Sequence, residues 1–473
     1  KKIIKMLLVI LLLTILIIFY LSSVGVKTER LNEGIKNKIS KINKKIQLDL
    51  RDVKILLDPY NFRVNIITKD VTVLLGGKKI EIKKVKTSIS LQSLILKEFS
   101  VDNLQISTKF IKLGDLILLS RSFKNSTELF LLDNVVKSGF LIADIKLKFD
   151  ENGNIKKDYQ ITGSIKNAQL NFLNKIKAKN LSLEFDIKKN KYFLKKIKSE
   201  INKIELSSQS IEINKNKDIF FIKGKILSNK NEFDKDQFNI KKFNFLKNLN
   251  IEKIRFSSEN DISFNISKRL KINDLSILSK INLDQLAIKN NLINLKSYLP
   301  NLEELVNFEN HKITIEYSKN NLDIKGNGKI LVKDNLDSIN YEIIKNNNRF
   351  AFNTKINFKN STLLLDFLDY EKKENIDASI VIKGTFKKNS PITFNLISLI
   401  EKDNMILFKN LNLSKDFKLI SLDSFKFNYL NNNKIKNQLF LKKKVSNYSI
   451  EGESFDATNL INKIMDSDNE NSS

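Results

Sequence analysis

Apolar and polar residues alternate along most of the chain after about residue 48. The alternation is strict in "LSLEFDI" (181–187), "FAFNTKINF" (350–358) and "IDASIVIKGTF" (376–386). Side chains of a β-strand point to opposite sides of a sheet in turn, so this pattern predicts strands with one apolar and one polar face.

Short clusters of Asn, Lys, Gly and Asp separate these stretches, among them "DENGN", "KKNKY" and "LNNNK". Such clusters are typical of hairpin turns. The chain is therefore predicted to form a continuous antiparallel meander. The main exception is residues 290–308, where a helix is expected after Pro300.

The apolar face of such a sheet must be removed from water. Closure into a sandwich or barrel is the usual solution, but a sandwich of this length normally divides into domains, and no Pro- or Ser-rich linker interrupts the sequence. The alternative is a long curled sheet whose apolar face lines a trough suited to acyl chains. We expect a mainly β protein with a few short helices and such a β-groove over residues 48–465.

The candidate floor of this groove consists of the apolar positions of the three alternating stretches. Those of the second and third stretch are expected to share one face, provided that the two strands pair in the correct register. The predicted lipid-contacting residues are Leu181, Leu183, Phe185, Ile187, Phe350, Phe352, Ile356, Phe358, Ile376, Ile380, Ile382 and Phe386.

The chain begins with an uncharged apolar run. From Met6 to Leu21 a helix would be about 24 Å long, and about 31 Å if it continued to Val26, which matches the hydrocarbon core of a bilayer. A cleaved signal peptide with its site at residues 22–25 is the alternative, but its apolar region is usually shorter. We expect residues 1–26 to be a retained membrane anchor, with apolar positions Met6, Leu7, Leu8, Val9, Ile10, Leu11, Leu12, Leu13, Ile15, Leu16, Ile17, Ile18, Phe19, Tyr20 and Leu21.

Lys1, Lys2 and Lys5 precede the anchor, and positive charge on a short flank favours the cytoplasmic side for that end. The long remainder is then expected on the other side of the membrane.

Residues 27–47 have a helical period. Leu31, Ile35, Ile39, Ile42 and Ile46 are three or four positions apart, and lysines occupy the other positions. We predict an amphipathic helix here, which either packs on the following domain or lies on the membrane surface. Residues 466–473 are expected to be a polar tail.

Charge adds a possible class of partner. The chain has 82 Lys and Arg against 53 Asp and Glu, a formal net charge of +29. This excess allows a polyanionic partner, but most lysines alternate with apolar residues, which favours a solvated face. Cys is absent, which excludes disulfides and thiolate metal sites, and 13 Gly with 3 Pro exclude a collagen-like chain.

The sequence indicates no catalytic chemistry. His311 is the only histidine, and it is expected on the surface or in a loop. Gly326 and Gly328 lie in an alternating stretch and predict a strand or bulge, while Glu303 and Glu304 are expected at a helix start. With no phosphate-binding loop and no ligand cluster, we expect no cofactor, no metal and no enzymatic activity.

Three segments resemble the AsmA-like proteins of Gram-negative envelopes, particularly their YhdP-like branch. The first is residues 67–107, the second 159–187, and the third is "YSIEGESFDATNLINKI" at 448–464. The positions that carry the first similarity are Gly77, Ile80, Ile82, Val85, Leu91, Leu94, Glu98, Val101, Leu104 and Ile106.

The resemblance implies a single-pass inner-membrane protein with its amino terminus in the cytoplasm. It also implies a periplasmic β-groove of the bridge-like lipid-transfer type, which moves phospholipid towards the outer membrane. Other envelope proteins are possible partners.

A second interpretation is a structural or assembly factor that pairs a free edge strand with envelope proteins. Nucleic-acid binding is disfavoured, because it needs aromatic residues among clustered Lys and Arg, whereas the aromatic residues here follow the apolar alternation.

Overall fold

The computed structural model describes residues 2–30, 32–33, 35–37, 46–51, 53–75, 77–92, 101–123, 127–150, 156–172, 176–217, 219–235, 250–267, 271–289, 296–332, 335–387, 390–415, 418–445, 447–459, 461–462 and 465. The chain divides into two compact units. Unit 1 comprises Lys1–Ile226 and Phe264–Asn273, and unit 2 comprises Leu227–Ser263 and Asp274–Ser473.

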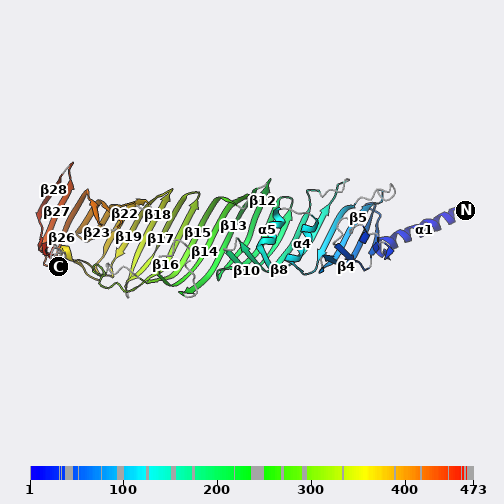
Figure 1. Ribbon diagram of the computed structural model, residues 1–473, viewed down its shortest axis with the longest axis horizontal. Coiled ribbons are helices and arrows are strands. Elements are labelled where there is room, and N and C mark those ends of the chain that lie inside the picture. Colours follow the sequence, from blue (N-terminus) through cyan, green and yellow to red (C-terminus); the bar gives the residue numbers. More distant parts are fainter. Residues whose placement is uncertain are drawn as a thin grey trace. The chain divides into compact units, whose positions relative to one another are not determined.

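The described chain is mainly β, as the alternation predicts. Of the described strands, 26 belong to one antiparallel sheet that is not closed, and β20 and β21 form a separate hairpin. Most strands pair with the next strand in the chain, so the predicted meander is confirmed (Figure 1).

Unit 1 contains the elements α1 (Lys2–Ser23), β1 (Val26–Thr28), β2 (Ile46–Asp49), β3 (Val53–Asp58), β4 (Arg63–Leu75), β5 (Lys78–Ser90), β6 (Val101–Thr108), β7 (Ile111–Lys112), α4 (Leu113–Phe123), α5 (Thr127–Val135), β8 (Val136–Lys148), β9 (Gln160–Phe172), β10 (Ile176–Lys188), β11 (Lys191–Ile201) and β12 (Ile204–Asn216). Three strands contribute residues to both units, namely β13 (Ile219–Asp234), β14 (Asn250–Ser267) and β15 (Ile272–Lys289).

The remaining elements lie in unit 2. They are β16 (Leu305–Ser318), β17 (Asn321–Val332), β18 (Asn335–Asn346), β19 (Arg349–Phe358), β20 (Leu363–Leu365), η3 (Asp366–Leu368), β21 (Tyr370–Lys372), β22 (Ala378–Lys387), β23 (Ile392–Glu401), β24 (Asn404–Leu413), β25 (Leu419–Ser421), β26 (Ser424–Leu430), β27 (Lys436–Lys443) and β28 (Tyr448–Ser454).

The first helix has the properties of a membrane span. All of its apolar side chains from Ile3 to Phe19 are exposed, and its mean hydropathy is 2.9. Two residues after the end of this helix, the chain passes close to β3 at Gly25, which has a φ of +69°. A Cβ at Gly25 would lie 2.3 Å from the carbonyl oxygen of Ile55. Only Gly allows both this backbone angle and this approach. Helix α1 is therefore long and apolar enough to anchor the chain in a membrane.

The segment that follows differs from the predicted helix over 27–47. Val26–Thr28 pairs with β3 and Ile46–Asp49 pairs with β4, so both ends of the segment are strands and the sheet begins well before residue 48. Residues 30, 32–33 and 35–37 are helical, while Ile39 and Ile42 lie outside the described residues. Backbone pairing at the sheet edge thus outweighs the helical period at the two ends.

Two helices that the sequence analysis did not predict cover part of unit 1. Helix α4 places Leu113 in a buried cluster with Leu141, Leu183 and Phe185 of the sheet, which we call the helix-covered cluster together with Ala143 and Ala168. Helices α4 and α5 are joined by an ion pair between Arg121 and Asp133.

The helix predicted after Pro300 is absent from the described residues 296–304, which form turns ahead of β16. Glu303 and Glu304 therefore start no helix. In this segment Leu299 packs against the core of unit 2. The backbone carbonyl of Tyr298 accepts a hydrogen bond of 2.8 Å from the amide of Leu364.

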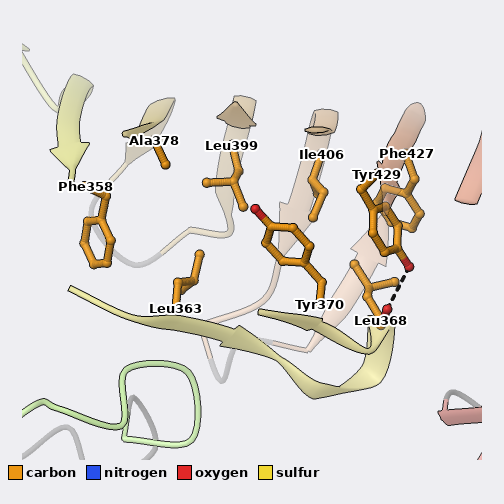
Figure 2. Packing of buried hydrophobic residues seen from close by; sticks show 9 residues of the cluster. All are labelled: Phe358, Leu363, Leu368, Tyr370, Ala378, Leu399, Ile406, Phe427 and Tyr429. Carbon is orange, nitrogen blue, oxygen red and sulfur yellow. Dashed lines mark hydrogen bonds between the residues drawn. The ribbon is translucent and has the colours of Figure 1, made fainter. Parts of the chain in front are cut away.

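A small hairpin caps the apolar face of unit 2. Strands β20 and β21 and the turn η3 contribute Leu363, Leu368 and Tyr370, which face side chains of β19, β22, β23, β24 and β26 (Figure 2). The resulting capped cluster consists of Phe358, Leu363, Leu368, Tyr370, Ala378, Leu399, Ile406, Phe427 and Tyr429. The hydroxyl of Tyr429 donates a hydrogen bond of 2.9 Å to the carbonyl of Leu368, which ties the cap to the sheet (Figure 2).

Buried polar groups hold the ends of this cap. The ammonium of Lys372 is fully buried and donates to the carbonyls of Lys359 and Ser361 at 2.7 and 2.8 Å. Burial lowers the pKa of Lys372. Asp337, only 2 % exposed, accepts hydrogen bonds from the amides of Lys359 and Asn360 and from the hydroxyl of Ser361 at 2.8, 2.9 and 2.6 Å.

Replacing Asp337 by Ala should therefore destabilise unit 2. Three donors would lose their acceptor inside the protein, at an expected cost of about 2–4 kcal/mol. The midpoint of urea unfolding, followed by β circular dichroism, measures this loss. Asp377 is a matched control, since its exposed carboxylate lies 3.5 Å from Lys359, and Asp377→Ala should cost less than about 1 kcal/mol. Equal shifts for both variants would contradict the proposed role of Asp337.

Candidate functional site

One part of the apolar face in unit 2 has no cap among the residues that the structure describes. Strand pairing aligns its side chains in rows that cross β15 to β23. The first row is Ile281, Ile313, Gly326, Tyr341, Thr354, Ile382 and Ile397, and the second is Ser279, Ile315, Ile324, Ile343, Phe352, Gly384 and Phe394. The third is Ile277, Tyr317, Leu322, Lys345, Phe350, Phe386 and Ile392. We call these rows the uncapped face.

The apolar side chains of the uncapped face are half-buried, and none of them belongs to a buried cluster of the described residues. A side chain covered by a second layer of protein is normally almost fully buried. Neighbouring side chains on the same sheet therefore supply the partial shielding, and the face remains accessible.

Aromatic rings make one end of this face continuous. The rings of Phe350 and Phe386 are stacked, with centroids 4.8 Å apart and an interplanar angle of 4°. Phe352 lies edge-on to Phe394 at 5.9 Å and contacts Phe386 at 6.3 Å. Three strands thus contribute to one apolar surface.

The opposite side of the same strands is polar. Lys325, Glu342, Asn353 and Lys383 lie in one row across β17, β18, β19 and β22, and Lys325 forms an ion pair of 3.2 Å with Glu342. This polar side includes a shallow hollow bordered by lysines, asparagines and Glu342. The sheet is thus amphipathic across its thickness, as the alternation predicts.

The structure brings the second and third predicted sets of floor residues together. Phe350 lies opposite Phe386, and Ile356 lies opposite Ile380, so the predicted shared face is confirmed. Phe350, Phe352, Ile382 and Phe386 lie on the uncapped face.

Other predicted floor residues lie at covered positions. Phe358 is a buried member of the capped cluster, and Ile356 and Ile380 pack against that cluster. In unit 1, Leu183 and Phe185 are buried under α4, while Leu181 and Ile187 are half-buried beside them. Ile376 was predicted to lie in a strand, but it is half-buried and precedes β22, which begins at Ala378.

His311 is not the surface residue that the sequence predicted. It is 2 % exposed in β16, with Nε2 at 3.0 Å from the carbonyl oxygen of Lys329 and Nδ1 at 3.3 Å from the hydroxyl of Tyr341. The carbonyl can only accept, so Nε2 carries the proton of the neutral ring and Nδ1 accepts from Tyr341. Burial lowers the pKa of His311.

A glycine on the neighbouring strand creates the space for this ring. A Cβ at Gly328 would lie 2.2 Å from Cδ2 of His311, and a Cβ at Gly326 would lie 2.2 Å from Cζ of Tyr341. The sequence analysis correctly assigned both glycines to a strand but could not detect the rings that lie over them, since these come from β16 and β18.

The described residues contain no group of three or more His, Asp or Glu side chains arranged to hold a metal ion. His311 has no carboxylate beside it, since its two polar contacts are a carbonyl and a tyrosine hydroxyl. This arrangement stabilises a strand pair, and it offers no activated nucleophile.

Comparison of the chain with protein-family models, with curated proteins and with solved structures finds no match. The uncapped face and the apolar helix are therefore the features on which a functional argument can be built.

The buried histidine predicts a pH dependence of stability. The folded state disfavours the charged ring, so the stabilisation is complete above about pH 6.5 and is lost as the pH falls below that value. The slope cannot exceed about 1.4 kcal/mol per pH unit for a single proton. His311 is the only histidine, so comparing the free energy of unfolding at about pH 7.5 and about pH 5.5 in the natural chain and in a His311 variant isolates its contribution. His311→Gln should remove most of the difference, and an unchanged difference in that variant would refute the assignment.

Proposed function

We propose that the protein is a membrane-anchored carrier or conduit for phospholipid, with acyl chains lying along the uncapped face. The observation that carries the proposal is this face itself, a run of aligned apolar residues over several strands over which the described part of the chain places no second layer. Soluble proteins rarely leave such a surface to water, because it promotes aggregation. Hydrocarbon chains are ligands of suitable shape, since rows of side chains run across many strands.

The helix α1 supports the same proposal. It is long and apolar enough to span a membrane and is joined to β1 by two residues, Val24 and Gly25, so an anchored sheet would begin directly at the membrane surface. The resemblance to AsmA-like proteins supports an inner-membrane anchor with the sheet in the periplasm and transfer towards the outer membrane. No catalytic step is part of the proposal.

A second candidate function follows from β28. Among the described strands it pairs only with β27, and Tyr448 and Ile450 on it are exposed. A free edge strand of this kind can add to the sheet of another protein. This observation favours the assembly-factor interpretation, in which binding would use backbone hydrogen bonds and leave the uncapped face unoccupied.

Ile382→Asp tests the lipid proposal. Ile382 lies on the uncapped face outside the capped cluster, so a carboxylate there would meet hydrocarbon without disturbing a packed core. We expect at least a severalfold loss of lipid bound to the purified chain, counted by native mass spectrometry, with the thermal midpoint largely kept.

Ile344→Asp is the matched control for this variant. Ile344 is 41 % exposed on the polar side of β18, and the same substitution there should leave the bound lipid unchanged. If Ile382→Asp keeps its lipid, acyl chains do not lie on this face. If it unfolds while Ile344→Asp does not, Ile382 is a core residue.

The anchor predicts a simple fractionation result. The full chain should remain in the membrane pellet after carbonate washing, because α1 matches the thickness of the hydrocarbon core. A chain without residues 2–23 should move to the supernatant. Release of a shortened natural chain that begins near Val24 would instead identify the first helix as a cleaved signal.

A further inference from the structure

The two ends of the strands in unit 2 differ in charge. In an antiparallel meander, alternate turns lie at the same end of the strands. The turns after β16, β18, β22, β24 and β27 therefore share one end, which we call the basic rim. It carries Lys319, Lys345, Arg349, Lys387, Lys418 and Lys444.

Among the described residues of these turns and of the connection from β24 to β26, the one acidic residue is Asp423, whose carboxylate accepts a hydrogen bond from Asn410. In addition, none of the six basic side chains forms an ion pair within the described part of the chain. Exposed like charges repel one another, so their alignment without carboxylate partners favours binding of an anion.

The opposite rim carries charges of both signs and is covered by the cap over β19, β22, β23, β24 and β26. Asp337, Asp369, Glu374, Asp377, Glu401 and Asp456 lie near the turns at that end or in the cap that arises there. Several of them are used in internal hydrogen bonds, such as those from Asn432 to Asp369 and from Asn301 to Glu374. The cap itself covers the apolar face on this side. Over β19, β22 and β23, a ligand on the uncapped face therefore has its free side at the basic rim.

One contact links the basic rim to the apolar surface. The ammonium of Lys345 lies 5.7 Å above the ring of Phe350, which in turn stacks on Phe386. Positive charge and stacked aromatic rings thus meet at one border. A phospholipid has a complementary arrangement, with a negatively charged phosphate next to its hydrocarbon chains.

We propose that the basic rim holds the phosphate groups of anionic phospholipids whose acyl chains lie on the uncapped face. This inference rests on the proposed function and specifies it further. It predicts that headgroups lie along one rim only and that net negative lipids are preferred over zwitterionic ones.

The test uses the full chain in detergent with equal amounts of phosphatidylglycerol and phosphatidylcholine of identical acyl chains. Bound lipids are counted by native mass spectrometry. The natural chain should retain phosphatidylglycerol in about fivefold or greater excess, the size expected for one basic side chain close to a lipid phosphate. The excess should fall at high ionic strength, because exposed charges are screened.

Charge reversal at the rim is the decisive variant. Lys319→Glu, Arg349→Glu and Lys387→Glu together, none of them in the rows of the uncapped face, should abolish the preference while the chain still binds lipid. The matched control reverses three exposed lysines at the opposite rim, Lys373→Glu, Lys402→Glu and Lys434→Glu, with the same change in net charge. Helix α1 is identical in all variants, so lipid bound around it contributes equally.

The outcomes separate the two proposals. Equal loss of preference in both triple variants, or no preference in the natural chain, would overturn the basic-rim proposal while lipid binding stands. If Ile382→Asp leaves the total lipid unchanged, the proposed function itself fails. Should the Glu variant fail to fold, the neutral variant with Gln at residues 319, 349 and 387 provides the same comparison, again with loss of preference expected.

Discussion

The structure depends on one constraint: a single-layer amphipathic sheet has to shield its apolar face without a second sheet. The protein meets this constraint locally. Helix α4 covers the strands around β8 to β10, and the hairpin β20–β21 covers the ends of β19, β22, β23, β24 and β26. The side chains between and beyond such covers shield one another only in part.

The cap in unit 2 illustrates the energetic balance. Its two strands have only three residues each, which is too short for a stable isolated hairpin. Apolar contacts of Leu363, Leu368 and Tyr370 give it stability, while buried polar groups fix its position. The hydroxyl of Tyr370, whose pKa burial raises, donates to the carboxylate of Glu401 on β23. A buried polar group bonded in this way makes one placement of the cap much more favourable than its alternatives.

Strand identity and the two faces could be predicted from the sequence, since period-two alternation is a local signal. The shared face of the apolar positions in 350–358 and 376–386 followed from it, whereas the residue pairs, such as Phe350 with Phe386, come from the structure. Helix α4 was missed although Leu113, Leu116 and Ile117 have helical spacing, because the surrounding alternation dominated the interpretation. Covers and burial could not be predicted in the same way. The burial of His311 depends on Gly328, a residue of another strand, and the capped position of Phe358 depends on a hairpin that resembles an ordinary turn.

The rings that lie over glycines also have a consequence for strand alignment. Strands rich in Ile, Lys and Asn look alike after a shift of two residues, which preserves the inner and outer faces. In the native alignment Phe352 lies over Gly384, where a Cβ would be 2.5 Å from its Cζ, and His311 lies over Gly328. A shift of two residues would place these rings against side chains with a Cβ, such as Ile382 or Phe386 in place of Gly384. Each glycine therefore favours one alignment of its strand with the neighbouring strand. A repetitive sequence thus obtains a unique register because a few of its residues have no Cβ.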